Sequence, residues 1–153
     1  MIRPAERRDI DGILAMWDAL QDDGTASDPR YATAPGGRAA MKARWADLWV
    51  CRDPFPGCFV ADDGALCGYV SGTLIPEHPI LVATATVRID NAYVAPRARR
   101  QGLGRRLVEA FIGAANRAGF RGVDVGTLVR DERAVAFWRG LGFDPMRITL
   151  TRA

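Results

Sequence analysis

Two closely spaced glycines follow a cluster of arginines in the second half of the chain, and this spacing is typical of an anion site. Residues 87–107 read VRIDNAYVAPRARRQGLGRRL, in which an apolar run predicts a strand and the residues after Gly104 show helical periodicity. The first amides of a helix lack intrahelical partners, and the helix dipole adds positive potential there. A strand, a glycine loop and a helix in this order therefore predict a phosphate-binding loop.

The spacing of this loop distinguishes three classes of phosphate site. A P-loop requires Lys and Ser or Thr after its second glycine, and two arginines follow Gly104, so that class is excluded. A dinucleotide fingerprint requires a third glycine where this chain has Leu107, although Asp124 lies at a suitable distance. The loop resembles instead the acyl-CoA loop of the GCN5-related N-acetyltransferases (GNAT family), Arg/Gln-x-x-Gly-x-Gly/Ala, supplied here by Arg99, Gly102 and Gly104.

A second motif supports the same resemblance. Residues 131–143 read DERAVAFWRGLGF, which is similar to the closing segment of that family, Asn-x-x-Ala-x-x-Phe-Tyr-x-x-x-Gly-Phe. Two family positions are changed, with Asp131 in place of Asn and Trp138 in place of Tyr. The two motifs cover roughly the C-terminal half, and on them the chain is identified as a member of the GNAT family.

The hydrophobic pattern predicts an order of strand, two helices, three strands, helix, strand, helix and strand. The predicted strands lie at 2–3, 58–61, 66–75, within 80–94, at 122–127 and at 146–151, and the predicted helices at 10–21, 35–49, 104–118 and after Asp131. This order indicates an α/β (α+β) fold with a mixed, mostly antiparallel sheet of six or seven strands and helices on both faces. The resemblance implies the same acyl-CoA N-acyltransferase fold, and we expect residues 1–153 to form a single domain.

The composition is that of an ordinary globular protein, with 48% hydrophobic and 25% charged residues. No apolar run approaches the ~20 residues of a membrane span, and the first residues are charged, unlike a secretory signal. We therefore expect a cytoplasmic protein without a membrane partner. Cys51, Cys58 and Cys67 lack metal-ligand spacing, so we expect no metal site, and we expect Cys58 and Cys67 to pack as reduced thiols in strands.

The net charge of +3 and the isoelectric point near 9.0 raise the alternative of a nucleic-acid-binding domain. Five arginines fall within residues 97–106, but a basic rim is also expected on a loop that binds a pyrophosphate. RNA sites more often interleave aromatic with basic residues, and Tyr93 is the only aromatic residue nearby. We therefore expect no nucleic-acid partner.

The resemblance implies a set of coenzyme-binding residues. Amides of the loop would hold the pyrophosphate of coenzyme A, and the end of the preceding strand would part from its neighbour and bind the pantetheine amides. The implied residues are Ala92, Val94, Arg99, Arg100, Gln101, Gly102, Leu103, Gly104 and Arg105, with Asp131 and Trp138 of the closing segment. Acetyl-CoA is the implied co-substrate.

Acetyl transfer requires a neutral amine, a polarised thioester and a protonated leaving thiolate. The family often has an acid where this chain has Arg88, which cannot act as a base. Asp90 lies two residues further on, so a regular strand points it to the same face, and it is the candidate base. The alternative is a structural carboxylate paired with Arg88. The indole of Trp138 cannot deliver a proton, so Tyr93 is the candidate acid, with Tyr69 or water as alternatives.

The function that the resemblance implies is acetyl-CoA-dependent N-acetylation of a primary amine of a small molecule or peptide, and a homodimer is common among relatives. Two alternatives stay open: an inactive acyl-CoA-binding module, motivated by Arg88 and Trp138, and a nucleic-acid-binding domain. Asp22, Asp23 and Asp28 fall in a predicted polar loop, which in the family forms one wall of the acceptor site. These carboxylates favour a cationic acceptor and Arg88 an anionic one, so the sequence leaves the acceptor open.

Overall fold

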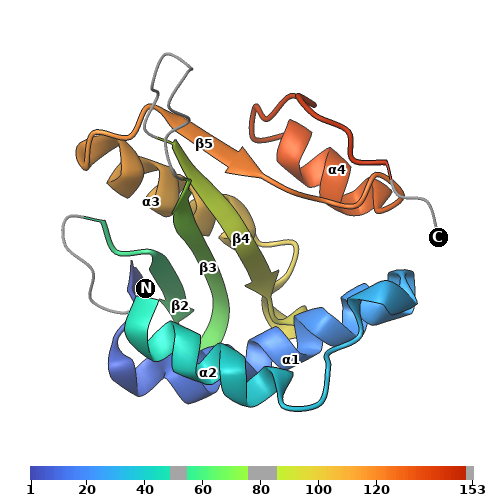
Figure 1. Cartoon of the computed structure of the whole chain (residues 1–153). Coiled ribbons are helices and arrows are strands. Elements are labelled where there is room, and N and C mark those ends of the chain that lie inside the picture. Colours follow the sequence, from blue (N-terminus) through green and yellow to red (C-terminus); the bar gives the residue numbers. More distant parts are fainter. Residues whose placement is uncertain (49–54, 76–85, 151–153) are drawn as a thin grey trace.

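Helices cover both faces of a five-stranded sheet in the computed structural model, which describes residues 1–48, 55–75 and 86–150 (Figure 1). In chain order the elements are β1 (Ile2–Pro4), the 3₁₀ turn η1 (Arg7–Asp9), α1 (Ile10–Ser27), η2 (Pro29–Tyr31), α2 (Gly37–Leu48), β2 (Cys58–Asp62), β3 (Leu66–Ile75), β4 (Thr86–Val94), η3 (Pro96–Ala98), α3 (Leu103–Arg117), β5 (Gly122–Val125) and α4 (Glu132–Arg139).

The sheet has the strand order β1-β2-β3-β4-β5, and neighbouring strands are antiparallel except β4 and β5, which are parallel. The parallel pair needs a long connection, which α3 supplies by crossing one face of the sheet. The mixed, mostly antiparallel fold predicted from the sequence is therefore confirmed. The number of strands is a correction, because the described residues form five strands rather than six or seven.

The predicted last strand accounts for part of this difference. Residues 146–150 have no regular structure, so that prediction is wrong for them, and Thr151 lies outside the described residues. An alternating pattern makes a segment suitable for a strand, but a strand forms only where a neighbour takes up its backbone hydrogen bonds. Within the described part of the chain, β5 pairs with β4 alone.

The hairpin of β2 and β3 follows the sequence prediction. The Asp62 carboxylate accepts a hydrogen bond from the Gly64 amide at 3.1 Å, and Gly64 has a φ of 102°, which favours glycine at this turn. Cys58 and Cys67 are buried free thiols in these two strands, as predicted. Cys51 lies outside the described residues, as does His78, the one histidine.

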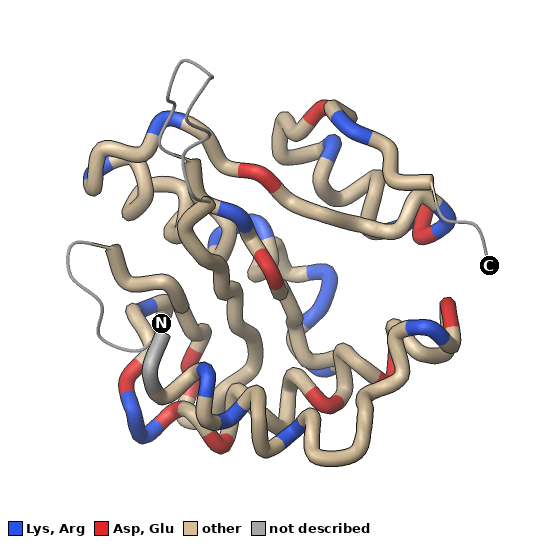
Figure 2. Tube along the Cα trace, in the orientation of Figure 1, with Lys and Arg blue, Asp and Glu red and all other residues tan. Residues whose placement is uncertain are grey.

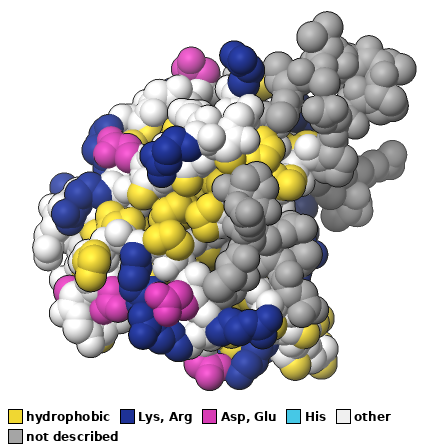
Figure 3. Space-filling model, turned by 90° about the vertical axis from the view of Figure 1, so that its left-hand side faces the viewer, with side chains coloured by type: hydrophobic (Ala, Val, Ile, Leu, Met, Phe, Trp, Pro, Cys, Tyr) yellow, Lys and Arg dark blue, Asp and Glu magenta, His cyan; other side chains and the backbone are white. Residues whose placement is uncertain are grey.

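Two apolar layers fill the space between the helices and the sheet, and burial of such surface is the main favourable contribution to folding. Under α1 and α2, Leu14, Trp45 and Val60 are almost fully buried. On the opposite face Phe111 of α3 is fully buried, and α4 joins this layer through Trp138. Figure 3 shows one side of the molecule, where apolar side chains gather in the middle and charged side chains lie around them.

Helix α1 is longer than the sequence predicted. The prediction ended it at Gln21 and placed residues 22–29 in a polar loop, but the helix continues to Ser27. It ends there because Asp28 precedes Pro29, and the residue before a proline is disfavoured in the helical conformation. The last turns of α1 carry few apolar residues, so the sequence shows no helical spacing of apolar residues there.

Strand β4 contains a bulge at Asp90. Ile89 pairs with Gly72 of β3 and Asn91 pairs with Ser71, so Asp90 has no partner residue on β3. A Cβ on Gly72 would overlap the carbonyl oxygen of Arg88, and only glycine allows the two backbones to approach this closely. A bulge bends a strand and increases its twist, and here it lies just before the site.

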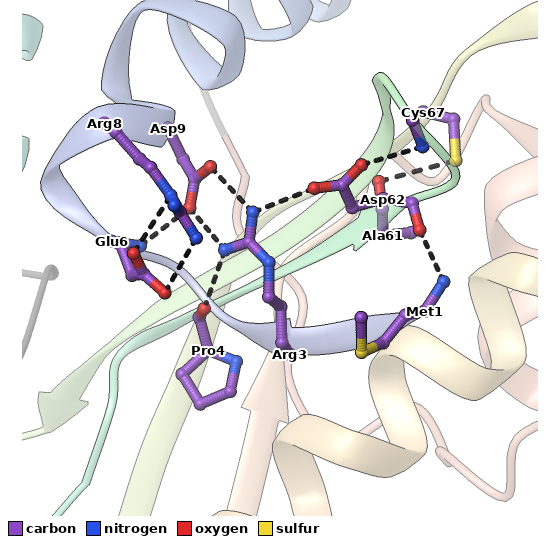
Figure 4. A network of polar contacts seen from close by, with 10 residues as sticks. Met1, Arg3, Pro4, Glu6, Arg8, Asp9, Ala61, Asp62 and Cys67 are labelled. Atoms are coloured by element: carbon purple, nitrogen blue, oxygen red, sulfur yellow. Dashed lines mark hydrogen bonds and ion pairs between the residues drawn. The ribbon is translucent and has the colours of Figure 1, made fainter.

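An ion-pair network ties β1 to the first helical turn and to the hairpin (Figure 4). The Arg3 guanidinium lies 2.6 and 2.9 Å from the two carboxylate oxygens of Asp9 and 3.0 Å from Asp62. Asp9 is buried, and its carboxylate also accepts a hydrogen bond from the Glu6 amide at 2.8 Å. The hydrogen bonds from Arg3 are the main cause that lowers the pKa of both Asp9 and Asp62.

We predict that Arg3→Met lowers the free energy of unfolding by about 3 kcal/mol at pH 7, because it leaves the buried Asp9 carboxylate without its cation. A lowered carboxyl pKa stabilises the fold above the ordinary carboxyl pKa, and this contribution disappears as the pH falls through the lowered value. The difference between parent and variant should therefore shrink toward pH 3. Urea unfolding at pH 7 and pH 3 measures it.

The matched control is Arg38→Met. Arg38 lies 2.8 Å from Asp18, but both side chains are well exposed, so removal of this pair should change the free energy of unfolding by less than about 1 kcal/mol. Equal losses in the two variants at pH 7 would contradict the special role of the Arg3 network.

Candidate functional site

A cleft opens where β4 and β5 part. The two strands pair over only four positions, from Thr86 to Ile89 on β4, whereas β4 stays paired with β3 up to Val94. The backbone of residues 91–94 therefore has no partner strand on the β5 side, among the residues described. Two cavities of about 490 and 800 Å³ meet along this edge, and residues 92–94 line both.

The glycine loop lies at the end of this strand edge. Gly102 precedes the first turn of α3 with a φ of 71°, and Arg100 is also left-handed with a φ of 65°. The left-handed conformation costs a non-glycine residue about 1–2 kcal/mol, and such strain is typical of functional loops. The Arg106 amide bonds to the Gly102 carbonyl at 3.1 Å, so the amides of residues 103–105 precede the hydrogen-bond ladder of α3. These amides form a concave set of donors suited to an anion.

The five arginines at 97–106 have different structural roles. Arg97 and Arg105 each donate a hydrogen bond to a backbone carbonyl elsewhere in the chain, that of Leu66 at 3.1 Å and that of Gly140 at 2.6 Å. These two side chains fasten the loop region to β3 and to the end of α4. Neither Arg100 nor Arg106 has a hydrogen bond or ion pair with the part of the chain that the structure describes, and only Arg100 of the two lines a cavity.

Arg99 lies between the two cavities and lines both. Its Nε donates a hydrogen bond to the Val94 carbonyl at 2.8 Å, and its guanidinium lies 5.5 Å from the ring centroid of Tyr93. A terminal nitrogen is 3.6 Å from the carboxylate of Asp23 on α1. Arg99 therefore joins the glycine loop, the open strand edge and the facing helix.

Asp90 lies just before the open strand edge, on the same face as Arg88. Val87 and Ile89 are buried while Arg88 and Asp90 are exposed, so the regular alternation expected before the bulge is present. Loss of hydration in its surroundings raises the pKa of the Asp90 carboxyl, while a hydrogen bond with Thr73 and the nearby charges of Arg44 and Arg88 act in the opposite direction. A carboxylate with a raised pKa is a better proton acceptor than a fully solvated one.

Tyr93 and Tyr69 are directly opposite each other on β4 and β3. Tyr93 is half-buried and lines both cavities. Tyr69 is fully buried, 6.1 Å from Trp45 between ring centroids, and its hydroxyl has no hydrogen-bond partner among the described residues. Burial is the main cause that raises the pKa of Tyr69 well above its ordinary value. The phenol with access to the cleft is therefore that of Tyr93.

The closing segment forms the wall of the cleft opposite α1. Asp131 accepts a hydrogen bond from the Ala134 amide at 3.0 Å and so caps α4, as the sequence predicted. Trp138 is buried with its ring 5.0 Å from Phe137 and 5.4 Å from Phe143, measured between centroids. Both Asp131 and Trp138 line the larger cavity, but neither lines the smaller cavity at the glycine loop.

Phe137 is a site residue that the sequence analysis did not assign. It lines both cavities, and a Cβ on Gly104 would lie 3.3 Å from its ring. Its ring therefore packs directly over the glycine loop. The available signal was its position in the Phe-Tyr pair of the closing motif, but only the packing of α4 on α3 shows which member of that pair faces the loop.

A sequence model of the Acetyltransferase (GNAT) family matches residues 14–143. The chain belongs to the GNAT family. The match includes the parted strands, the glycine loop and the closing segment described above, and it confirms the resemblance seen in the two motifs. No curated protein matches the sequence significantly.

Solved structures with the same fold as this GNAT chain are distant in sequence. A variant of the BH1408 protein from Bacillus halodurans has a TM-score of 0.80 at 17% identity, with 100% of this chain and 99% of that chain covered. A putative acetyltransferase from Agrobacterium tumefaciens has a TM-score of 0.71 at 23% identity, with 100% and 99% covered. The aminoglycoside N-acetyltransferase AAC(6')-Iy, solved in complex with CoA, has a TM-score of 0.73 at 16% identity, with 100% and 93% covered.

The acidic loop expected to flank the acceptor site of this GNAT protein is helical up to Ser27, and only Asp28 of its three aspartates lies outside the helix. Asp22 and Asp23 lie in α1, and Asp28 is buried between Arg30 at 2.6 Å and Arg130 at 4.0 Å. Asp23 is paired with Arg99 across the cleft. Acidic and basic residues thus occur on both walls, near the end of α1 and the start of α4 (Figure 2).

None of the helices in the part of the chain that the structure describes combines the length and the apolar character required to cross a membrane. In the same part of the chain, no group of three or more His, Cys, Asp and Glu side chains is arranged to hold a metal ion.

We predict that Thr73→Val raises the pKa of the Asp90 carboxyl further, because it removes a hydrogen bond that favours the ionised form. Arg88→Met should shift the pKa in the same direction by less, since the Arg88 charge is the smaller influence. The carboxyl carbon signal of Asp90, followed by NMR across a pH series and assigned with Asp90→Asn, measures the shift. A lower pKa in Thr73→Val would show that this hydrogen bond does not stabilise the carboxylate.

Proposed function

We propose that this protein transfers the acetyl group of acetyl-CoA to a primary amine of a small molecule or peptide. The observation that carries the proposal is the junction of an open strand edge with a glycine loop at the start of a long helix, both lining one cleft. Extended amide-containing chains bind to open strand edges, and phosphates bind to helix starts. Coenzyme A contains both kinds of group, joined in one molecule.

The smaller cavity supplies the donor site. The amides of residues 100–105 would bind the pyrophosphate, with the side chains of Arg99 and Arg100 adding positive charge. The backbone of Ala92 and Val94 would hydrogen-bond the pantetheine amides. Phe137 covers the loop from the α4 side, and Asp131 and Trp138 shape the wall beyond it. Gln101, Leu103 and Gly104 contribute backbone amides, and Arg105 holds α3 to α4.

Asp90 is the proposed proton acceptor. The attacking amine must lose one proton, and Asp90 lies on β4 just before the edge where the thioester would end. Its raised pKa, caused mainly by loss of hydration, makes it a stronger proton acceptor than a fully solvated carboxylate. The charge of Arg88 on the same strand favours the ionised form of Asp90, which is a positioning role rather than a catalytic one.

Tyr93 is the proposed proton donor to the leaving thiolate. The amine nitrogen forms a bond to the acetyl carbon, the carbon–sulfur bond breaks, and the sulfur takes up a proton to give free coenzyme A. Tyr93 is the phenol that reaches the cleft, and the Arg99 guanidinium lies 5.5 Å from its ring centroid. Trp138 cannot take this role, since its indole N–H is not acidic at any relevant pH.

The acceptor would enter through the larger cavity, between α1 and residues 128–134. Solved neighbours include aminoglycoside N-acetyltransferases, one of them in complex with a CoA-linked acetylneamine analogue. The cavity of this chain contains Asp23, Asp131 and Glu132 together with Arg99, Arg130 and Arg133. Charges of both signs suit an acceptor that carries both an amine and an acidic or hydroxyl group, as peptides and many small metabolites do.

An inactive acyl-CoA-binding module is the second candidate, and the burial of Trp138 in the apolar layer favours it because no acid then occupies that position. The two functions share the donor site and differ in turnover. Consumption of acetyl-CoA with a panel of primary amines separates them, since binding without turnover on any amine would leave only the second.

We predict that Gly102→Glu abolishes coenzyme A binding, because the new carboxylate would face the pyrophosphate at the start of α3. No atom lies within 4 Å of the position that the added Cβ would take, so the variant should keep the fold. Calorimetric titration with coenzyme A measures the loss. Undiminished affinity would show that the loop is not the pyrophosphate site.

The matched control is Gly119→Glu, at the opposite end of α3. Gly119 is also left-handed, with a φ of 90° and open space around it, so this variant bears the same backbone strain and the same added charge. It should bind coenzyme A as the parent does. Thermal unfolding of both variants confirms that they are folded.

A separate prediction concerns turnover. Asp90→Asn should lower kcat/KM by roughly 10²–10⁴-fold, with the deficit largest at low pH where neutral amine is scarce and smaller at high pH where the amine needs no base. Coenzyme A affinity should stay unchanged, since Asp90 lies outside the loop. Asp63→Asn, in the exposed hairpin turn, is the control. An identical pH–rate profile in parent and Asp90→Asn would remove Asp90 from the mechanism.

A further inference from the structure

Polar side chains gather near the start of β4, on the side of the sheet that faces α1 and α2. Tyr69 of β3 belongs to the apolar layer under these helices, and because alternate residues of a strand share a face, Ser71 and Thr73 lie on the same side. Arg88 of β4 is directly opposite Thr73. Asn91 is directly opposite Ser71, and its side-chain amide donates a hydrogen bond to the Ser71 hydroxyl at 3.4 Å. Directly opposite residues point to the same face of a sheet, so these side chains form one polar surface.

Asp90 joins this polar surface to the acceptor entrance. Its carboxylate has a hydrogen bond with Thr73, and a basic position precedes the acidic one along β4 (Figure 2). Tyr93 lies on the same face, directly opposite Tyr69, and it lines the larger cavity. The polar surface therefore continues from that cavity along β4, with Asp90 between the cavity and Arg88.

The charges beside Asp90 do not balance. Arg88 and Arg44 of α2 both lie near enough for their charges to favour the Asp90 carboxylate, so two guanidinium groups face one acid. Both arginines are exposed, and neither forms a salt bridge or a side-chain hydrogen bond with another described residue. Arg38, on the same helix as Arg44, is by contrast paired with Asp18 at 2.8 Å. One positive charge is therefore left over, and a guanidinium binds a carboxylate through two parallel hydrogen bonds.

We propose that the acceptor is a free amino acid, with its carboxylate bound by Arg88 and Arg44 and its amine held at Asp90. This inference rests on the proposed function and names the substrate class for it. Side chains two residues apart on a strand are separated by about 6.6 Å, so Asp90 and Arg88 suit an amine and a carboxylate that are only a few bonds apart. An acceptor with several amines is disfavoured, because its further positive charges would face the two arginines.

The test compares L-amino acids with their own carboxamides as acceptors, followed by the consumption of acetyl-CoA. The carboxamide keeps the amine but has no negative charge, so it forms no charge-assisted hydrogen bond with a guanidinium. We expect the parent to give a kcat/KM roughly 10- to 100-fold higher for its preferred amino acid than for the carboxamide of that amino acid. The amine of a carboxamide is the less basic of the two and is more often neutral, so a preference for the acid requires recognition of the carboxylate.

Arg88→Gln and Arg44→Gln should each lower this acid-to-amide ratio by roughly tenfold, through a higher KM for the acid. The ratio separates recognition of the carboxylate from the effect of the Arg88 charge on Asp90, because the same base serves both acceptors. The two arginines lie on different elements, so one variant keeps the test valid where the other does not fold.

The matched control is Arg38→Gln, which removes another exposed guanidinium of α2 and should leave the ratio unchanged. Equal kcat/KM values for acids and carboxamides in the parent, a preference kept in both variants, or an equal loss in Arg38→Gln would overturn the inference and leave the proposed function intact. Absence of turnover with every amine would instead contradict the proposed function. Calorimetric titration of the same acids and carboxamides into protein saturated with coenzyme A then decides, since equal binding of the two, or none, would overturn the carboxylate site.

Discussion

The unequal pairing of β4 is the constraint on which the rest of the site depends. β4 keeps its hydrogen bonds to β3 up to Val94, but its pairing with β5 ends after Ile89. The bulge at Asp90 bends the strand at this point, and Gly72 on β3 makes the close approach of the two backbones possible. Because β4 separates from β5 but stays paired with β3, its free backbone groups point in a fixed direction. A ligand that binds them does not have to order a flexible loop, which would cost conformational entropy.

The glycine loop is positioned by the same stretch of chain. η3 and the loop lead from the end of β4 directly into α3, and α3 is anchored in the core by Leu107 and Phe111, which are almost fully buried. The strand edge and the helix start therefore keep a constant relation to each other. The left-handed Arg100 is tolerated because this anchoring outweighs its strain.

The walls of the cleft are less strongly held than its base. Arg99 bridges to Asp23 of α1 at 3.6 Å, and both side chains are about half exposed or more, so this contact contributes little stability. The opposite wall depends on α4, which packs on the core through Trp138.

Local pattern by itself determined the β2–β3 hairpin, the glycine loop, α3 and the cap at Asp131, because turn residues, helix starts and periodicity act over a few neighbouring residues. It also carried both family motifs. Only the tertiary structure decided the bulge at Asp90, the position of Phe137 over the glycine loop, and the number of strands. These features depend on which residues meet across the sheet and between helices, and contacts between distant parts of the chain leave no periodic signal in the sequence.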